Sequence, residues 1–193
     1  MRVPRHALST PSRPVVRAQA RGGALVALGV VLLGAPLGLL WAAIAPRAAV
    51  VVTASGPSFR DAEGEAFIAA DGTLFLLGLA AGVAVAVPAF LLGRHRAPGV
   101  LLGLLLGSAL AAALAWRVGV LTDDRDAVLA ALRDTSIIGD VDLPLQLRAR
   151  AALLGWPLGA GATFAVLELR RADTIPEEPP GADRQPASTG EPT

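Results

Sequence analysis

Acidic side chains spaced two residues apart are the groups in this sequence that could do chemistry. Examples are Glu63 and Glu65, Asp124 and Asp126, and Asp140 and Asp142. Their oxygens could hold Ca²⁺ or Mg²⁺, or serve as acid and base toward a substrate. The aspartate pairs lack the glycine and distal glutamate of a calcium-binding loop, and a solvated acidic loop explains them more simply. We therefore predict no metal site and no catalytic residue.

Other reactive side chains are scarce. The chain has no Cys, which excludes thiolate chemistry, and its two histidines, His6 and His95, lie too far apart in the sequence for ligand spacing. There is no G-x-S-x-G, no H-E-x-x-H and no phosphate-binding loop. All 17 basic residues are Arg, which we do not interpret as a nucleic-acid signal. We expect a protein that is not an enzyme, holds no cofactor and binds no nucleic acid.

The elements that would have to position any such group are membrane-spanning helices. The chain is 53% hydrophobic, and no charge interrupts residues 72–93, which as a helix would extend roughly 33 Å, enough to cross a bilayer. Similar apolar runs predict four spans, at about residues 23–45, 72–93, 98–116 and 151–167. The predicted fold is all-α: a polytopic four-transmembrane-helix bundle over residues 22–170, with two extracytoplasmic loops that could carry short helices.

The first span has an alternative interpretation as a cleaved signal peptide, because a basic segment precedes it and Ala43 and Ala45 are small residues at the spacing of a cleavage site. The length of the apolar run and Pro46 after the cleavage point favour an uncleaved span. The fourth span is the shortest of the four predicted.

Both ends of the chain have the composition of disordered tails. Residues 1–21 hold five Arg, three Pro and no acidic residue, and residues 172–193 hold five Pro and five acidic residues. Between the spans, residues 47–71 predict a strand at 48–53, a turn at Gly56-Pro57 and an amphipathic helix over 59–70. In the loop 117–150 we expect a helix capped by Thr122 or Asp123. The two outer loops together would form a small helical cap.

The charges predict an orientation in the plasma membrane. Arginines without acidic partners flank the spans on the side of the two termini, and both loops on the other side are net acidic. By the positive-inside rule, the N- and C-termini are cytoplasmic. Trp41, Trp116 and Trp156 then lie near the outer ends of their helices, where we predict that they act as interfacial anchors at the headgroup level.

Small residues recur at a spacing of four in every span, which places them on one helix face where two backbones can approach closely. The predicted helix-packing residues are Gly34, Gly38, Gly78, Gly82, Gly99, Gly103, Gly107, Gly155 and Gly159. Because the link between the second and third spans is short, we expect these two spans to form an antiparallel hairpin with a shared glycine seam. Pro36, Pro88 and Pro157 lie within spans and could kink them.

Four segments of the chain carry a resemblance to a known family. The segments are GAPLGLLWAAIAP at 34–46, EAFIAADGTLFLLGLAAG at 65–82, LAWRVGV at 114–120 and LRARAALLGWPLGA at 147–160. They resemble an actinobacterial family of small multi-pass membrane proteins, classed as a domain of unknown function, over residues 22–170. The resemblance implies four transmembrane helices and a GC-rich Gram-positive source, but it assigns no functional residue.

Three functions fit these features. The uncharged spans and small-residue faces favour an interaction or accessory protein of the cell envelope, which contacts the lipid bilayer and either another membrane protein or a second copy of itself. A carrier or channel-like protein for an apolar or lipid-like solute is the alternative, compatible with the prolines and the uncharged spans. A membrane enzyme would require the acidic residues of the two outer loops to converge.

Overall fold

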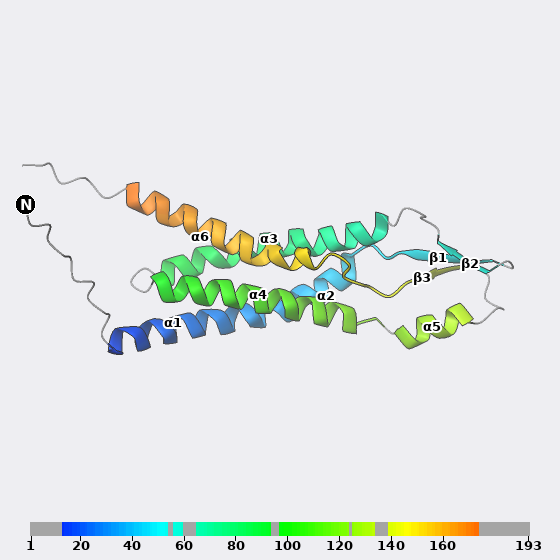
Figure 1. The fold of residues 1–193 in the computed structure, drawn as a ribbon, viewed down its shortest axis with the longest axis horizontal. Helices are drawn as coiled ribbons and strands as arrows, with labels where there is room; N and C mark the ends of the chain where they lie inside the picture. The colour runs from blue at the N-terminus through cyan, green and yellow to red at the C-terminus, as the bar shows by residue number, and fades with distance from the viewer. Residues whose placement is uncertain are drawn as a thin grey trace, which may run out of the picture.

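The computed structural model describes residues 13–53, 56–59, 65–93, 97–123, 125–133 and 139–173. The elements in chain order are α1 (Arg13–Leu32), α2 (Gly34–Ile44), β1 (Ala49–Thr53), β2 (Gly56–Phe59), α3 (Glu65–Leu92), α4 (Ala97–Leu121), α5 (Arg125–Arg133), β3 (Gly139–Asp142), the 3₁₀ helix η1 (Arg150–Leu154) and α6 (Gly155–Asp173). Helices dominate, and they run along the long axis of the molecule (Figure 1).

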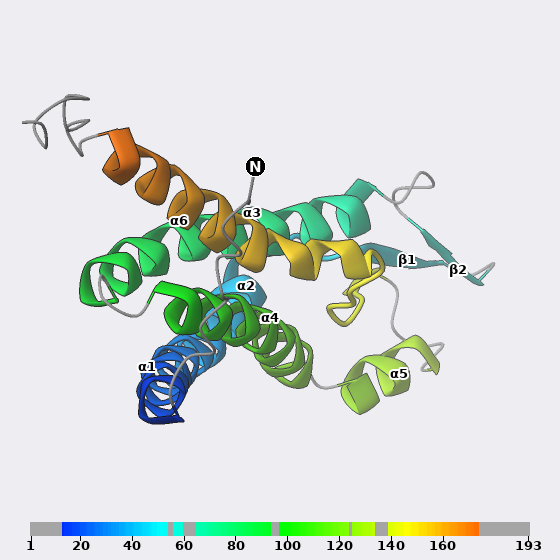
Figure 2. The same ribbon diagram turned by 60° about the vertical axis from the view of Figure 1, so that its left-hand side comes forward.

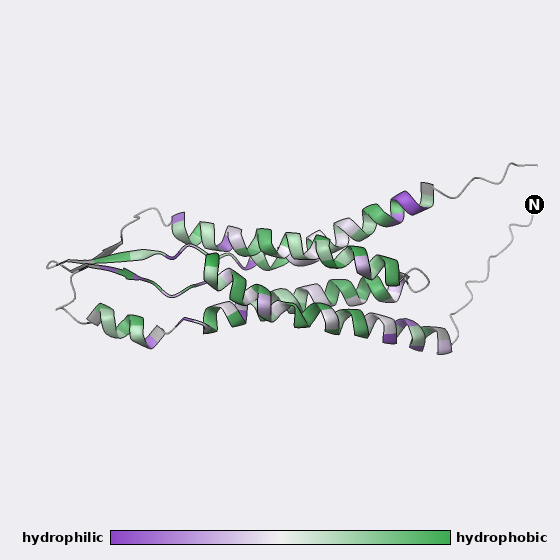
Figure 3. Ribbon diagram, turned by 180° about the vertical axis from the view of Figure 1, so that it is seen from behind, coloured by the Kyte–Doolittle hydropathy of each residue, from purple (hydrophilic) through white to green (hydrophobic). Residues whose placement is uncertain are grey.

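Four helical segments are long and apolar enough to cross a membrane. They are Val16–Ile44, Glu65–Leu92, Pro98–Leu121 and Arg150–Ala172. Hydrophobic residues cover the length of the bundle, and hydrophilic ones gather near its two ends (Figure 3). The predicted fold class, a four-span all-α membrane protein, is confirmed, and the fourth span is a helix even though it is short.

The two ends of the bundle differ. The start of α1 and the end of α6 lie at one end, which we call the terminal end (Figures 1 and 2). The strands and α5 lie at the opposite end, which we call the sheet end. The two spans joined by the short link, α3 and α4, run antiparallel as predicted.

The sheet end holds a three-stranded antiparallel sheet in the order β2-β1-β3. The predicted strand at 48–53 is present as β1, whose β-branched Val50–Val52 suit extended backbone. The predicted turn at Gly56-Pro57 is wrong, since these residues begin β2 and pair with Thr53 and Val52. The connection 143–149 leads from β3 back to the bundle, so the loops form a sheet with one helix rather than a helical cap.

The helices of the loops also differ from expectation in their bounds. The helix leading into the second span begins at Glu65, and residues 60–64 lie outside the described part of the chain. The expected helix in the second loop is present as α5. Its sequence has Val128, Leu129 and Leu132 on one side, which is the pattern that predicted it.

The predicted N-terminal tail of residues 1–21 is too long, because α1 begins at Arg13. Pro14 is tolerated in the first turn of a helix, where its missing N–H has no partner to lose. From there α1 packs on α4, with Gln19 against Gly99. Residues 1–12 and 174–193 of the predicted tails lie outside the described residues, as do Arg94 and Arg96.

Pro36 interrupts the first span. It has no N–H to donate to the carbonyl of Leu32, and its ring crowds that carbonyl. The helix breaks at Leu33, whose N–H donates to the carbonyl of Val30 at 3.1 Å in a tighter turn. In contrast, Pro88 lies inside the unbroken α3, and Pro157 lies in the first turn of α6, where proline is tolerated.

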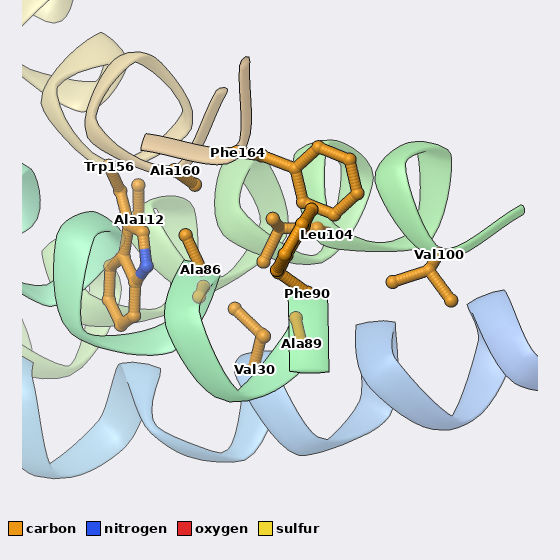
Figure 4. Packing of buried hydrophobic residues seen from close by; sticks show 11 residues of the cluster. Val30, Ala86, Ala89, Phe90, Val100, Leu104, Ala112, Trp156, Ala160 and Phe164 are labelled. Atoms are coloured by element: carbon orange, nitrogen blue, oxygen red, sulfur yellow. The ribbon is translucent and has the colours of Figure 1, made fainter. Parts of the chain in front are cut away.

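Four helices contribute to the main apolar cluster (Figure 4). The labelled side chains are Val30 of α1; Ala86, Ala89 and Phe90 of α3; Val100, Leu104 and Ala112 of α4; and Trp156, Ala160 and Phe164 of α6. The rings of Phe90 and Phe164 meet edge to face, with centroids 5.4 Å apart. Many of the other buried positions are Ala or Gly, so the helices meet at short range.

Candidate functional site

Glycines of α4 form a seam with α1. Gly99 lies against Gln19, Gly103 against Gly23, and Gly107 against Ala27. A Cβ added to Gly103 would collide with the carbonyl group of Gly23, which is backbone and cannot move aside without moving α1. The two helices therefore touch backbone to backbone along this seam.

Two further seams have the same construction. Gly78 and Gly82 of α3 lie against Trp156 of α6, while Gly155 and Gly159 of α6 lie against Phe75 and Leu79 of α3; Gly34 and Gly38 of α2 lie against Ala111 and Ala115 of α4. All nine predicted packing glycines thus face the backbone or side chains of a neighbouring helix.

The partners of these glycines differ from one expectation. The second and third spans were expected to share a seam because their link is short, but α3 directs its glycines to α6 and α4 directs its glycines to α1 and α2. The glycine faces are covered inside the protein, so self-association through these faces would require the bundle to open. Sequence reasoning also missed Gly23 and Gly119, although Gly23 and Ala27 have the same four-residue spacing as the predicted set.

Two of the three tryptophans are buried among the helices. Trp41 is fully buried, donates from Nε1 to the carbonyl of Ala70 at 2.9 Å, and fills space that Gly119 leaves open. Trp156 is 1% exposed, and its ring lies among the helices (Figure 4). Both rings thus pack against protein, and their role as interfacial anchors stays a prediction.

Trp116 is only half-buried, and Arg117 lies over its ring at 5.9 Å from the centroid. The Nε1 atoms of Trp116 and Trp156 and the Oγ of Ser108 are buried without a hydrogen-bond partner among the described residues. The anchor role of Trp116 stays a prediction.

Asp71 holds the connection 143–149 against the bundle. It lies in α3 and is only 7% exposed. Its Oδ1 accepts the backbone N–H of Arg148 at 3.2 Å, and its Oδ2 accepts that of Ala149 at 2.6 Å. A carboxylate that accepts two backbone N–H groups is well satisfied despite its burial. Asp71 is thus hydrogen-bonded to two residues that lie 77 and 78 positions further along the chain.

Asp123 holds the same connection at a second point. One of its oxygens accepts the backbone N–H of Leu145 at 2.6 Å, and the other pairs with Arg47 at 3.0 Å. Arg47 also donates to the carbonyl of Ala42 at the end of α2. Asp123 was predicted as a possible cap of α5, as was Thr122, but Thr122 donates instead to the carbonyl of Gly119 at 2.7 Å.

We call the groups around Asp71 and Asp123 the carboxylate junction. Arg148 belongs to it as well, because its guanidinium lies 3.4 Å from the centroid of the Phe67 ring. The junction brings together the end of α2, the start of α3, the end of α4 and the connection 143–149. Its charged groups are engaged with backbone, with each other or with a ring, so the arrangement fixes the sheet end on the bundle.

The acidic pair on β3 lies outside this junction. Asp140 and Asp142 lie on β3, across from Val51 and Ala49 of β1, and both are exposed. Glu63 and Asp124 lie outside the described residues. Within the part of the chain that the structure describes, no three His, Asp or Glu side chains are grouped as a metal site would require.

A comparison with known proteins identifies relatives of the chain. A family model described as "Protein of unknown function (DUF2567)" matches residues 30–139, more than half of the chain. The chain belongs to the DUF2567 family. One relative is "Uncharacterized protein ML1222" of Mycobacterium leprae (strain TN), an actinobacterium, 39% identical over 101 residues. This agrees with the predicted resemblance.

The matched stretch covers about half of this DUF2567 chain and half of its relative, at 50% and 51%. No solved structure matches the chain. The DUF2567 match includes Asp71 and Asp123 but ends at Gly139, before the connection that both residues hold. The carboxylate junction therefore extends beyond the residues that match the family model.

Proposed function

We propose that this protein is a non-enzymatic accessory protein of the cell envelope, which binds another envelope protein through its sheet end. The observation that carries the proposal is the carboxylate junction. Asp71 and Asp123 fix the connection 143–149 on the bundle, so β3, which precedes it, has a defined position relative to the spans. Because such a surface is already ordered, binding a partner does not carry the entropic cost of ordering it.

The strands of the sheet end supply the binding surface. β1 is the central strand, so β2 and β3 each have one edge that pairs with no described strand. A free strand edge can accept an extended segment of a partner through backbone hydrogen bonds. Nearby, Leu129 of α5 is 48% exposed and adds apolar surface.

The same proposal includes the orientation of the chain. The terminal end carries exposed Arg17, Arg21 and Arg170 next to the spans, and by the positive-inside rule this end lies in the cytoplasm. The sheet end then lies outside the plasma membrane, where envelope partners are accessible.

Site-specific photo-cross-linking in cells tests the proposed interface. A photoreactive amino acid replaces Asp142, which is exposed on β3, or Leu28 as the control, which is 59% exposed on a spanning helix. We expect a discrete cross-linked protein from position 142 and none from position 28. Recovery of the monomer alone from position 142, or the same cross-linked protein from positions 142 and 28, would remove the basis of the proposal.

One observation favours a second function, a carrier for an apolar or lipid-like solute. A groove of about 280 Å³ lies where the first span is broken, between α2 and α3 with Trp156 of α6 at its wall. Its lining is apolar and includes Leu33, Pro36, Ala84 and Val85. Such a groove could hold part of a chain-like apolar molecule.

Analysis of the molecules that co-purify with the protein separates the two functions. A carrier should retain an apolar molecule that is enriched over the bulk membrane lipid, and Ala84→Trp should expel it by filling the groove. Val83→Trp is the matched control, because Val83 is the neighbouring exposed residue and does not line the groove. Extracts with the composition of the bulk membrane would argue against the carrier.

A further inference from the structure

Two arginines near the start of α1 form a cationic pair. Arg17 and Arg21 are one helical turn apart, both are exposed, and neither has an acidic partner among the described residues. The first acidic residue of the whole sequence is Asp61. With Ile44 at the opposite interface, a helical rise of about 1.5 Å per residue places Arg21 at the near edge of a hydrocarbon core about 30 Å thick and Arg17 among the headgroups.

A groove runs between α1 and α4 beside this pair. Its volume is about 370 Å³, within the range of small-molecule sites. Its apolar lining includes Ala20, Ala24 and Ala27 from α1 and Pro98, Leu102 and Leu106 from α4. The groove exists because Gly23, Gly99 and Gly103 bring the two backbones together without side chains that would fill the flank of the seam.

The groove and the cationic pair are adjacent. Ala24 lines the groove, and it also lines the surface hollow that contains Arg17 and Arg21. A positively charged site at the level of the headgroups therefore adjoins an apolar groove that faces the bilayer interior. Gln19 lies in the groove as well and offers amide donors near its headgroup end.

We propose that this place binds an anionic phospholipid. Its phosphate accepts hydrogen bonds from the guanidinium groups of Arg17 and Arg21, and one acyl chain lies in the groove against Ala24 and Leu102. Guanidinium groups bind phosphate through paired, charge-assisted hydrogen bonds, and basic pockets at helix ends are known to select anionic headgroups. The bound lipid would brace the α1–α4 seam at the terminal end.

Thermal unfolding of the purified full-length chain in neutral detergent tests the proposal. Phosphatidylglycerol should raise the melting temperature by roughly 3–5 °C for each tenfold excess over its Kd, whereas phosphatidylcholine and glycerol phosphate should not. The double variant Arg17→Gln/Arg21→Gln should lose this shift. Ala24→Trp, which leaves the charges in place but fills the groove, should reduce it.

The matched control is Arg170→Gln/Arg171→Gln, which removes the same charge from the same end of the molecule. These arginines lie on α6, away from the start of α1 (Figures 1 and 2). The control should keep the full shift with phosphatidylglycerol. An equal loss of the shift in both double variants, a full shift in Ala24→Trp, or an equal shift with phosphatidylcholine or glycerol phosphate would overturn the proposal.

Discussion

Asp71 shows how a single buried carboxylate can connect distant parts of a chain. Its two oxygens accept the backbone N–H groups of Arg148 and Ala149. Buried N–H donors that lose their acceptor leave an unfavourable desolvation cost, and hydrogen bonds to a charged group are stronger than neutral ones. The stability of the carboxylate junction should therefore depend on this side chain.

Replacing Asp71 with Ala should lower the free energy of unfolding by about 2–4 kcal/mol, because two N–H groups lose a charged acceptor. Asp71→Asn should cost less, since one amide oxygen remains to accept. Thermal unfolding in detergent measures both. The control is Asp142→Asn on the exposed part of β3, and a variant Asp71→Ala as stable as this control would contradict the assigned role.

Sequence reasoning did not identify this role for Asp71. The residue marked the start of an apolar run, and that boundary is all that hydropathy can express. The groups it binds are backbone N–H groups of a segment far along the chain, which carry no side-chain signal. Asp123 was likewise interpreted through its neighbours in sequence, as a cap of α5, while its partners Arg47 and Leu145 come from other elements.

At the scale of elements, the glycine seams set the distance between helices. In lipid there is no hydrophobic driving force between spans, so close packing and weak backbone contacts hold them together. The seam of α1 and α4 shows this most directly, since Gly103 meets the carbonyl group of Gly23. A side chain at this position must push the helices apart.

We expect Gly103→Leu to destabilise the bundle by about 1–3 kcal/mol, as overpacking of a tight contact does. Gly29→Leu is the matched control on α1, because a Cβ there meets nothing within 4 Å, and it should change stability by less than about 0.5 kcal/mol. Melting temperatures in detergent compare the two. Equal melting temperatures for the two variants would show that the seam does not hold the bundle.

The break between α1 and α2 should depend on Pro36. In Pro36→Ala a new N–H can donate to the carbonyl of Leu32, so the amides near Leu33 should exchange with deuterium more slowly. Amides in the middle of α6 are the internal reference, because they lie on another helix and should exchange at the same rate in both chains. Exchange near Leu33 that stays as fast in Pro36→Ala as in the parent chain would assign the break to another cause.

The sequence predicts where a helix or strand lies more reliably than it predicts which other element that helix or strand packs against. Uninterrupted apolar runs predicted all four spans, and the valines predicted β1. Which helix receives each glycine face depends on the arrangement of the whole bundle, and the short link between α3 and α4 suggested the wrong pair. The pairing of β1 with β3 joins two loops that are separated by two spans, which local patterns do not encode.

The whole molecule has an apolar bundle with two unlike ends. The terminal end carries exposed arginines of α1 and α6, and the sheet end carries β1–β3, α5 and the carboxylate junction (Figure 1). The proposed functions depend on which end faces the cytoplasm. An envelope partner can reach the sheet end only if that end lies outside the membrane.

Cysteine labelling in intact cells tests this central claim most directly, because the chain has no Cys of its own. Asp142→Cys marks the sheet end, and Arg170→Cys marks the terminal end. A membrane-impermeant maleimide should label position 142 in intact cells and position 170 only after the cells are broken, while the unaltered chain stays unlabelled. Labelling of position 170 in intact cells, with position 142 protected until lysis, would contradict the proposed orientation.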